Sequence, residues 1–258
     1  MRRLRFLLPV IQHAAAGGVS EFTTPAIGIS AMDKINIGCG YDHRPGYLNV
    51  DMDPACKPDL LLVDNDFSNV PKRHFAHLAA IDVLEHIPRM QTMMALLEWA
   101  HLLKLGGTMT LKTSSILGVA RILEAHPTFA DQQNTTIYMF GNQAHAGDFH
   151  HTGFTETTLR TYLLSAGFEV DSLVVQDGWL FFLEAHKVGD WTYLLDSQLS
   201  DQEFLLAAYD SALYRKPDEP FTTHHLRELA AGQPRRALLK HVFGSLERCL
   251  RVAQRHNL

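Results

Sequence analysis

The stretch that decides the fold is residues 34–51, KINIGCGYDHRPGYLNVD. A short apolar run leads into the glycine turn Gly38-Cys39-Gly40, and a second apolar run ends at Asp51. A buried strand that runs into a glycine turn lets a ligand approach the backbone closely, because glycine has no Cβ. We therefore expect a ligand site where these two strands end.

The same pattern of short apolar runs continues along the chain. Strands are expected at 34–38, 48–51, 60–63, 78–82 and 108–113, with an antiparallel pair at 168–175 and 179–186. Apolar runs that alternate with helix-period segments predict parallel strands joined by crossover helices. The predicted fold class is α/β, a doubly wound, mostly parallel seven-stranded sheet, followed by a small all-α C-terminal module.

Two helices of the α/β domain are indicated by their end signals. Pro88 suits a first helical turn, a methionine stripe that includes Met90 and Met93 is expected in the core, and Gly106 with Gly107 should end this helix. Thr155 is the expected N-cap of another helix that ends at Gly167. Only residues 41–47 separate the glycine turn from the second strand, too few for a full crossover helix.

Composition limits the possible classes of protein. The chain has 258 residues, 46% of them hydrophobic and 20% charged, as in ordinary folded proteins. A net charge of −5 argues against a nucleic-acid partner. Cys39, Cys56 and Cys249 show no CxxC spacing, which disfavours disulfides and structural zinc and favours a cytoplasmic location.

The chain is expected to divide into an N-terminal arm at 1–32, an α/β domain at 33–190 and a helical module at 198–252. No run of about 18 apolar residues occurs, so no transmembrane segment is expected. The arm carries basic and apolar residues that can touch an anionic lipid surface, although a packing arm is the simpler interpretation.

Acidic residues follow the predicted strands. Asp51 ends the second, where a carboxylate can accept both hydroxyl hydrogens of a ribose. Asp64 ends the third, where it can receive an adenine amino group or serve as a turn cap. Glu85 and His86 follow the fourth, and structural roles are favoured for both. A glycine turn with a strand-end acid indicates a nucleoside.

The segments KINIGCGYDHRPGYLNVDMD, IDVLEHIP and LLKLGGTMTLKTS stand in the order typical of class I S-adenosylmethionine-dependent methyltransferases. Residues 33–187 resemble that family, in particular members that read GCG, then GYLNVD, then LEHIP. The resemblance implies S-adenosyl-L-methionine as cofactor. The implied cofactor-binding residues are Gly38, Cys39, Gly40, Asp51, Met52, Asp64, Asp82 and Glu85.

Two positions bear on that resemblance. Asn36 stands where the family usually has an acidic residue, which motivates the alternative of a catalytically silent nucleoside-binding scaffold that recruits partners. His43 occupies the place of the last glycine of GxGxxG, which disfavours a nicotinamide-dependent oxidoreductase.

The polar loop at 141–154 is a candidate substrate wall. His150 is the candidate catalytic base, since an imidazole with a pKa of about 6.5 can take a hydroxyl proton. His145, His150 and His151 beside Asp148 could also be metal ligands, but adjacent histidines on an irregular loop rarely point at one centre, so no metal is expected.

The C-terminal segment begins with a capping box of Ser200 and Glu203, and Pro234 should open a last helix that includes Leu246. Its basic residues, from Arg235 to Arg255, are expected on a solvated face, with an acidic partner as the alternative. Residues 202–247 resemble a helical domain of unknown function from bacterial surface-glycan proteins. By that association, the acceptor is expected to be a small molecule or a saccharide-linked group, and the module a possible protein-binding surface.

Overall fold

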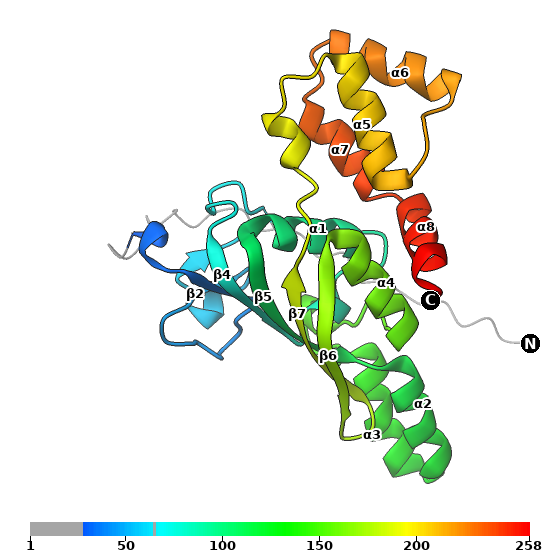
Figure 1. Cartoon of the computed structure of the whole chain (residues 1–258). Helices are drawn as coiled ribbons and strands as arrows, with labels where there is room; N and C mark the ends of the chain where they lie inside the picture. Colours follow the sequence, from blue (N-terminus) through cyan, green and yellow to red (C-terminus); the bar gives the residue numbers. More distant parts are fainter. Residues whose placement is uncertain (1–27, 64–65) are drawn as a thin grey trace, which may run out of the picture.

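The computed structural model describes residues 28–63 and 66–258, so the proposed arm lies almost wholly outside the described residues. Seven strands form one sheet in the order β3-β2-β1-β4-β5-β7-β6 (Figure 1). Neighbouring strands are parallel except for the β5–β7 and β6–β7 pairs, which are antiparallel. The predicted fold class is confirmed. The strands are β1 (Lys34–Ile37), β2 (Leu48–Asp51), β3 (Leu60–Leu61), β4 (Phe75–Ile81), β5 (Leu103–Ser114), β6 (Phe168–Gln176) and β7 (Leu180–Lys187).

Helices flank the sheet and continue beyond it. The α-helices are α1 (Thr92–Leu102), α2 (Ile116–Ala125), α3 (Phe129–Phe140), α4 (Glu156–Ala166), α5 (Asp201–Leu213), α6 (Glu219–Ala230), α7 (Arg235–Phe243) and α8 (Leu246–His256). Short 3₁₀ turns are η1 (Ile29–Ala31), η2 (Pro54–Cys56), η3 (Leu84–His86), η4 (Ala146–Asp148) and η5 (Tyr193–Asp196). None of the helices within the described residues has the length and apolar character needed to cross a bilayer.

The helix expected at Pro88 begins later and ends earlier than the sequence indicates. The helix runs from Thr92 to Leu102. β5 starts at the next residue, and Gly106 and Gly107 lie inside that strand. Gly107 sits where β5 meets β4 with a shifted register, and an added Cβ would lie 3.2 Å from the carbonyl oxygen of Phe75. The glycines therefore serve strand pairing. Met93 is buried as expected, but Met90 is 80% exposed and does not belong to the core.

The helix at Thr155 is confirmed, with its N-cap hydrogen bond and left-handed Gly167. The sequence interpretation missed the antiparallel pair α2 and α3, which project from the sheet beside the β6–β7 turn (Figure 1). Ser115 and Thr128 cap these helices through side-chain hydrogen bonds. Tyr138 of α3 stacks on Trp179 of the turn, with ring centroids 4.1 Å apart.

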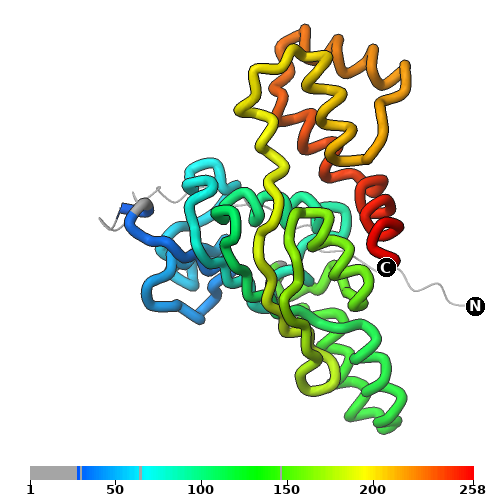
Figure 2. Tube along the Cα trace, viewed as in Figure 1, coloured from blue at the N-terminus to red at the C-terminus, as the bar shows by residue number. Residues whose placement is uncertain are grey.

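The C-terminal helices form a small module at the opposite end of the molecule from α2 and α3 (Figure 2). The last helix is split, since Gly244 and Ser245 separate α7 from α8, and Leu246 is 70% exposed. Buried residues of the module, such as Phe204 and Leu239, belong to the same hydrophobic cluster as the sheet. The module therefore packs directly on the α/β core.

The basic face predicted for this module is only partly solvated, since Arg255 is exposed but other basic side chains lie against acidic or carbonyl groups. Arg235 pairs with Asp201, and Lys240 pairs with Glu98 of α1. Arg248 is only 8% exposed, and its guanidinium donates to the carbonyl oxygens of Ser165, Ser211 and Ala212. These carbonyls lie at the C-terminal ends of α4 and α5, where the helix dipole favours a cation. The spacing of basic residues along one helix cannot show which neighbouring helices cover it.

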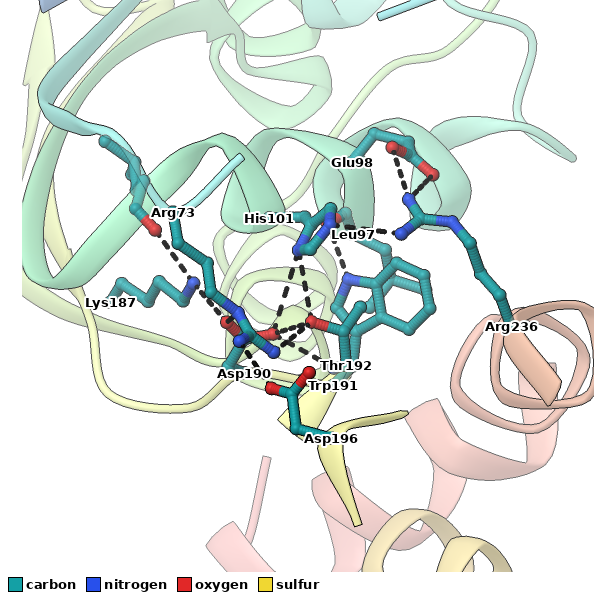
Figure 3. A network of polar contacts seen from close by, with 11 residues as sticks. Arg73, Leu97, Glu98, His101, Lys187, Asp190, Trp191, Thr192, Asp196 and Arg236 are labelled. Atoms are coloured by element: carbon teal, nitrogen blue, oxygen red, sulfur yellow. Dashed lines mark hydrogen bonds and ion pairs between the residues drawn. The ribbon is translucent and has the colours of Figure 1, made fainter. Parts of the chain in front are cut away.

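A polar network joins the linker after β7 to the core (Figure 3). The ammonium of Lys187, fully buried, donates to the carbonyl oxygen of Leu103 at 2.9 Å and to the Asp190 carboxylate at 3.0 Å. The guanidinium of Arg73 donates hydrogen bonds to the carboxylates of Asp190 and Asp196 in the same linker. Burial alone would raise the pKa of Asp190, but hydrogen bonds from Thr192 and Lys187 lower it to about 2.

His101 of α1 links this network to the module. Its Nδ1 lies 3.1 Å from the Thr192 hydroxyl, and its Nε2 accepts a hydrogen bond from Arg236 of α7 at 3.0 Å (Figure 3). The Glu98 carboxylate, one helical turn before His101, also accepts a hydrogen bond from Arg236. Burial, and then the positive charge of Arg236, lower the pKa of His101 to about 4.

Candidate functional site

A pocket of about 700 Å³ lies where β1, β2 and β4 end at their carboxyl edge. The lining residues come from the ends of β1, β2, β3 and β4, from the turns η2 and η3, and from the loop before α4. They are Ile37, Gly38, Gly40, Tyr41, Asp51, Met52, Asp53, Cys56, Leu62, Asp82, Val83, His86, His145 and Gly147. In open α/β sheets, ligands bind at this edge.

The two glycines after β1 are both left-handed, with φ of +60° at Gly38 and +49° at Gly40. An added Cβ on Gly38 would lie 2.6 Å from Cγ2 of Val83, so the turn approaches the end of β4 too closely for a side chain. Gly40 has no atom within 4 Å of the corresponding position, so its backbone borders open space in the pocket.

The Asp51 carboxylate is fixed by backbone donors at both oxygens. Gly40 N–H donates to Oδ2 at 2.7 Å, and Asp53 N–H donates to Oδ1 at 2.9 Å. Each carboxylate oxygen can accept two hydrogen bonds, so both keep the capacity to accept another. The glycine turn thus orients the acidic group that the sequence places opposite it.

The short link between β1 and β2 contains no helix, as expected, and is held by buried amides. Asn36 Nδ2 donates to the carbonyl oxygen of Asp42 at 2.8 Å and to Oδ1 of Asn49 at 3.1 Å. Asn49 in turn donates to Asp59 and accepts from the backbone N–H of Arg44. Asn36, which departs from the family pattern, is therefore a brace for the glycine loop and does not line the pocket.

The side chains that line the pocket give it a negative charge. Three carboxylates, those of Asp51, Asp53 and Asp82, line it, and the lining residues within the described parts of the chain include no Lys or Arg. Met52 and Leu62 supply apolar surface beside Asp51. Such a pocket favours a ligand that combines an apolar ring with hydroxyl and cationic groups, and disfavours a pyrophosphate.

The remaining predicted cofactor residues are placed differently. Cys39 does not line the pocket: it is 4% exposed, and burial, with the charge of Asp51, raises its thiol pKa to about 12. Asp64 lies outside the described residues. Glu85 is 2% exposed and also lies behind the lining, where Thr113 donates to its carboxylate at 2.9 Å.

Glu85 connects the pocket to the loop before α4. Its carbonyl oxygen accepts the backbone N–H groups of His151 at 2.8 Å and Thr152 at 3.0 Å. Burial raises the pKa of its side chain to about 7. Glu85 thus lies just after β4, as expected, but its carboxylate and carbonyl oxygen bind other residues of the protein and do not face the pocket.

His86, for which the sequence favoured a structural role, ends η3 and faces the loop before α4. It lines the pocket, and its Nδ1 lies 3.0 Å from the carbonyl oxygen of Phe149, so Nδ1–H donates and Nε2 keeps a free lone pair. Burial lowers its pKa, which keeps the ring neutral near pH 7. The fold of the loop that supplies Phe149 was the missing information.

His150 lies behind His86. Their rings meet edge to face with centroids 4.7 Å apart, and His150 Nδ1 lies 3.2 Å from the carbonyl oxygen of Tyr138. Burial, and then the charge of His86, lower the pKa of His150. His150 does not line the pocket but supports the ring that does.

His145 lines the pocket but has both nitrogens engaged. Its Nδ1 accepts from the Gly147 N–H at 3.1 Å, and its Nε2 lies 3.0 Å from the Asp148 carboxylate. His145, His150 and His151 do not converge on one point with Asp148 in the described residues. This loop therefore supplies part of the pocket wall, through His145 and Gly147.

No protein-family model matches the chain, and no curated protein matches it. Solved structures are similar at low identity. The 1,6-didemethyltoxoflavin-N1-methyltransferase of Burkholderia thailandensis, with bound 1,6-didemethyltoxoflavin and S-adenosylhomocysteine, is 15% identical over 60% of this chain and 71% of that one, with a TM-score of 0.40. An S-adenosylmethionine-dependent methyltransferase of Methanosarcina mazei is 19% identical over 61% and 93%, at 0.41. One from Mesorhizobium loti is 13% identical over 60% and 91%, at 0.43. Similarities this distant assign no activity to the chain.

Proposed function

We propose that the chain is an S-adenosylmethionine-dependent methyltransferase. The observation that carries the proposal is the pocket itself: a helix-free glycine turn faces a fixed Asp51, among three carboxylates and no lining Lys or Arg. A dinucleotide site needs a helix N-terminus or cations for its pyrophosphate. S-adenosylmethionine carries no phosphate and has a positive sulfonium, so it fits the charge of this pocket.

The residues present fit that cofactor. Asp51 would accept the ribose hydroxyls, and Met52 and Leu62 would pack against the base. Gly38 and Gly40 allow the backbone to approach closely, and Asp82 lies at the end of β4, where the charged amino-acid part would lie. When bound, the cofactor supplies an electrophilic methyl group.

The protein's own part in the chemistry is positioning and proton removal. We assign the base to His86, whose free Nε2 would take the proton of an acceptor hydroxyl while Phe149 holds Nδ1–H. His150 becomes a positioning residue that holds the His86 ring. The loop before α4, which lines the pocket through His145 and Gly147, would form the wall beside the acceptor, which we propose is a small molecule or a saccharide-linked group.

A cytoplasmic location fits the three cysteines, which are all free and buried within the described residues. The resemblance of the C-terminal segment to surface-glycan proteins supports the saccharide acceptor by association only.

Calorimetry tests the proposal. The wild-type chain should bind S-adenosylhomocysteine with micromolar affinity and should not bind NADH. Asp51→Asn should weaken binding about 10- to 100-fold, because charge-assisted hydrogen bonds to the ribose are lost. Asp210→Asn, an exposed acid on α5, is the matched control and should leave affinity unchanged.

Failure to bind S-adenosylhomocysteine would refute the proposal. If the chain binds S-adenosylhomocysteine but transfers no methyl group to any acceptor tested, including precursors of cell-surface polysaccharide, the silent nucleoside-binding scaffold would instead be favoured. In an active preparation, His86→Asn should lower the transfer rate far more than it changes the affinity for S-adenosylhomocysteine.

A further inference from the structure

A second cluster of chemically active side chains lies in α6 of the C-terminal module, on a different element from the pocket. His224, His225 and Glu228 are spaced so that Glu228 stands one turn above both histidines. One potential metal-binding atom of each residue lies within 4.8 Å of those of the other two.

The distances within the cluster suit a small divalent ion. Glu228 Oε2 lies 3.0 Å from Nδ1 of His225 and 3.4 Å from Nε2 of His224. Zinc bonds to nitrogen and oxygen are about 2.0–2.1 Å long, which in a tetrahedral site places neighbouring ligand atoms about 3.3 Å apart. The two separations from Glu228 lie on either side of that value, and all three ligand atoms lie within 4.8 Å of one another, so an ion would require at most a closer approach of the two histidines.

A second observation points to an unmet interaction at the same place. His225 is 5% exposed, and its Nε2 finds no hydrogen-bond partner among the residues that the structure describes. A buried imidazole nitrogen without a hydrogen-bond partner destabilises the folded state. Hydrogen bonding to Glu228 therefore satisfies only one of the two nitrogens of this buried ring.

The cluster opens into a pocket of about 340 Å³ between α6 and α7. His224, His225 and Glu228 form one wall, and His241 of α7 stands opposite, its ring centroid 5.6 Å from that of His225. Phe221 and Leu238 supply apolar surface on either side. A ligand-accessible coordination position would therefore face a partly apolar cavity.

We propose that His224, His225 and Glu228 bind a zinc ion, with the fourth coordination position open to this pocket. Two imidazoles and one carboxylate are a ligand set that zinc uses with an open position for water or an exogenous ligand. The absence of thiolate from the set disfavours copper(I), and the presence of two imidazoles disfavours magnesium and calcium. The site would rigidify the turn of α6 that packs on α5.

Cobalt(II) titration of the full chain tests the site, because cobalt replaces zinc in such sites and absorbs visible light. One equivalent of Co²⁺ should produce absorbance bands of low-symmetry coordination, and one equivalent of Zn²⁺ should remove them. Glu228→Gln keeps the shape and one acceptor of the side chain but should weaken metal binding more than about tenfold, since even outer-shell changes cost 10- to 100-fold.

The controls separate this cluster from the other histidines of the chain. Glu219→Gln, the same exchange at an exposed position in α6, should leave the titration unchanged. His224→Gln should weaken binding as Glu228→Gln does, whereas His241→Gln should change it less than about threefold. Equal loss in His241→Gln would overturn the three-ligand assignment.

Absence of the cobalt bands in the wild-type chain, or their persistence in Glu228→Gln, would overturn the proposal and leave Glu228 as the hydrogen-bond partner of His225 alone. The measurement involves neither S-adenosylmethionine nor methyl transfer. Its outcome is therefore independent of the proposed function.

Discussion

Single residues determine how the glycine turn is built, and the two glycines of the turn have different reasons to lack a side chain. Gly38 approaches Val83, whereas Gly40 borders the pocket. We predict that Gly38→Ala destabilises the protein by about 2–4 kcal/mol, from left-handed strain plus overpacking. Gly40→Ala should cost only about 1 kcal/mol, because strain acts alone. Urea unfolding of both variants measures the difference.

The same pair separates stability from ligand binding. Gly40→Ala should lower the affinity for S-adenosylhomocysteine in a chain that is still folded, since its methyl group would enter the pocket. In a Val83→Ala background the cost of Gly38→Ala should shrink. If the two glycine variants were equally unstable, the close approach to Val83 would not be the reason for Gly38.

Glu85 predicts a pH effect with a defined sign. Its pKa is about 7 in the folded chain and 4.5 as the ordinary value, because burial disfavours the carboxylate. Stability from this group is therefore present below pH 4.5 and is lost as pH rises through 7, by about 3 kcal/mol in total.

Glu85→Gln should accordingly resemble the wild type at acidic pH and become the more stable protein above pH 7. Urea unfolding at pH 4.5, 6 and 8.5 checks this, with Glu156→Gln, an exposed acid at the start of α4, as control. A stability difference that does not change with pH would mean that Glu85 ionises normally.

The residues that sequence alone could identify are those whose role is set by their own backbone. Gly38 and Gly40 follow a strand, Asp51 ends the next, and both features are local, so their meeting in one pocket follows from parallel strand order. The sequence could not show that His86 lines the pocket and that the Cys39 side chain is buried away from it. Whether a side chain after a strand faces the pocket or the core depends on the loop from Phe149 to Thr152, which is far away in sequence.

At the scale of secondary-structure elements, helix caps were predictable and helix arrangement was not. Ser200 with Glu203 and Thr155 with Gly167 are local hydrogen-bonding patterns, and both are confirmed. The pair α2 and α3 was missed because many of its apolar residues, such as Leu117, Phe129 and Phe140, are exposed and do not mark a face that packs on the sheet. The sequence cannot show that Trp179 will provide the stacking surface.

Arg248 is the residue that binds three helices together. We predict that Arg248→Met destabilises the chain by about 2–4 kcal/mol, because it removes charge-assisted hydrogen bonds to the ends of α4 and α5 and leaves buried carbonyl groups without a partner. Arg255→Met, in the same helix, removes a cation–π contact with Tyr214 and should cost less than about 1 kcal/mol. Guanidinium unfolding compares the two. A similar loss in both would contradict the capping role of Arg248.

For the molecule as a whole, the junction between core and module predicts acid sensitivity. His101 has a pKa of about 4, below its ordinary 6.5, because of burial and then Arg236. Between about pH 4 and pH 6.5, the imidazole of His101 is therefore protonated in the unfolded chain and neutral in the folded chain. Stability from this group is present above pH 6.5 and is lost as pH falls through 4, by about 3 kcal/mol.

His101→Gln removes the pH-dependent contribution of this imidazole to stability. The stability advantage of the wild type over the variant should therefore shrink by about 3 kcal/mol between pH 7 and pH 4. Glu85 acts in the opposite direction over part of this range, which is why the comparison is between variants and not along one curve. His126→Gln, an exposed histidine, is the control. Parallel pH curves for His101→Gln and the wild type would show that the imidazole does not hold the junction in its neutral form.

The strand order also has a consequence for synthesis on the ribosome. β7 inserts between β5 and β6, so one whole side of β5 stays unpaired until α2, α3, α4 and β6 have emerged and β7 arrives. An unpaired strand edge is a template for pairing with other chains. Nascent chains stalled before Leu180 should consequently be clients of ribosome-associated chaperones, whereas chains released just beyond Lys187 have a closed ladder and no longer expose that edge.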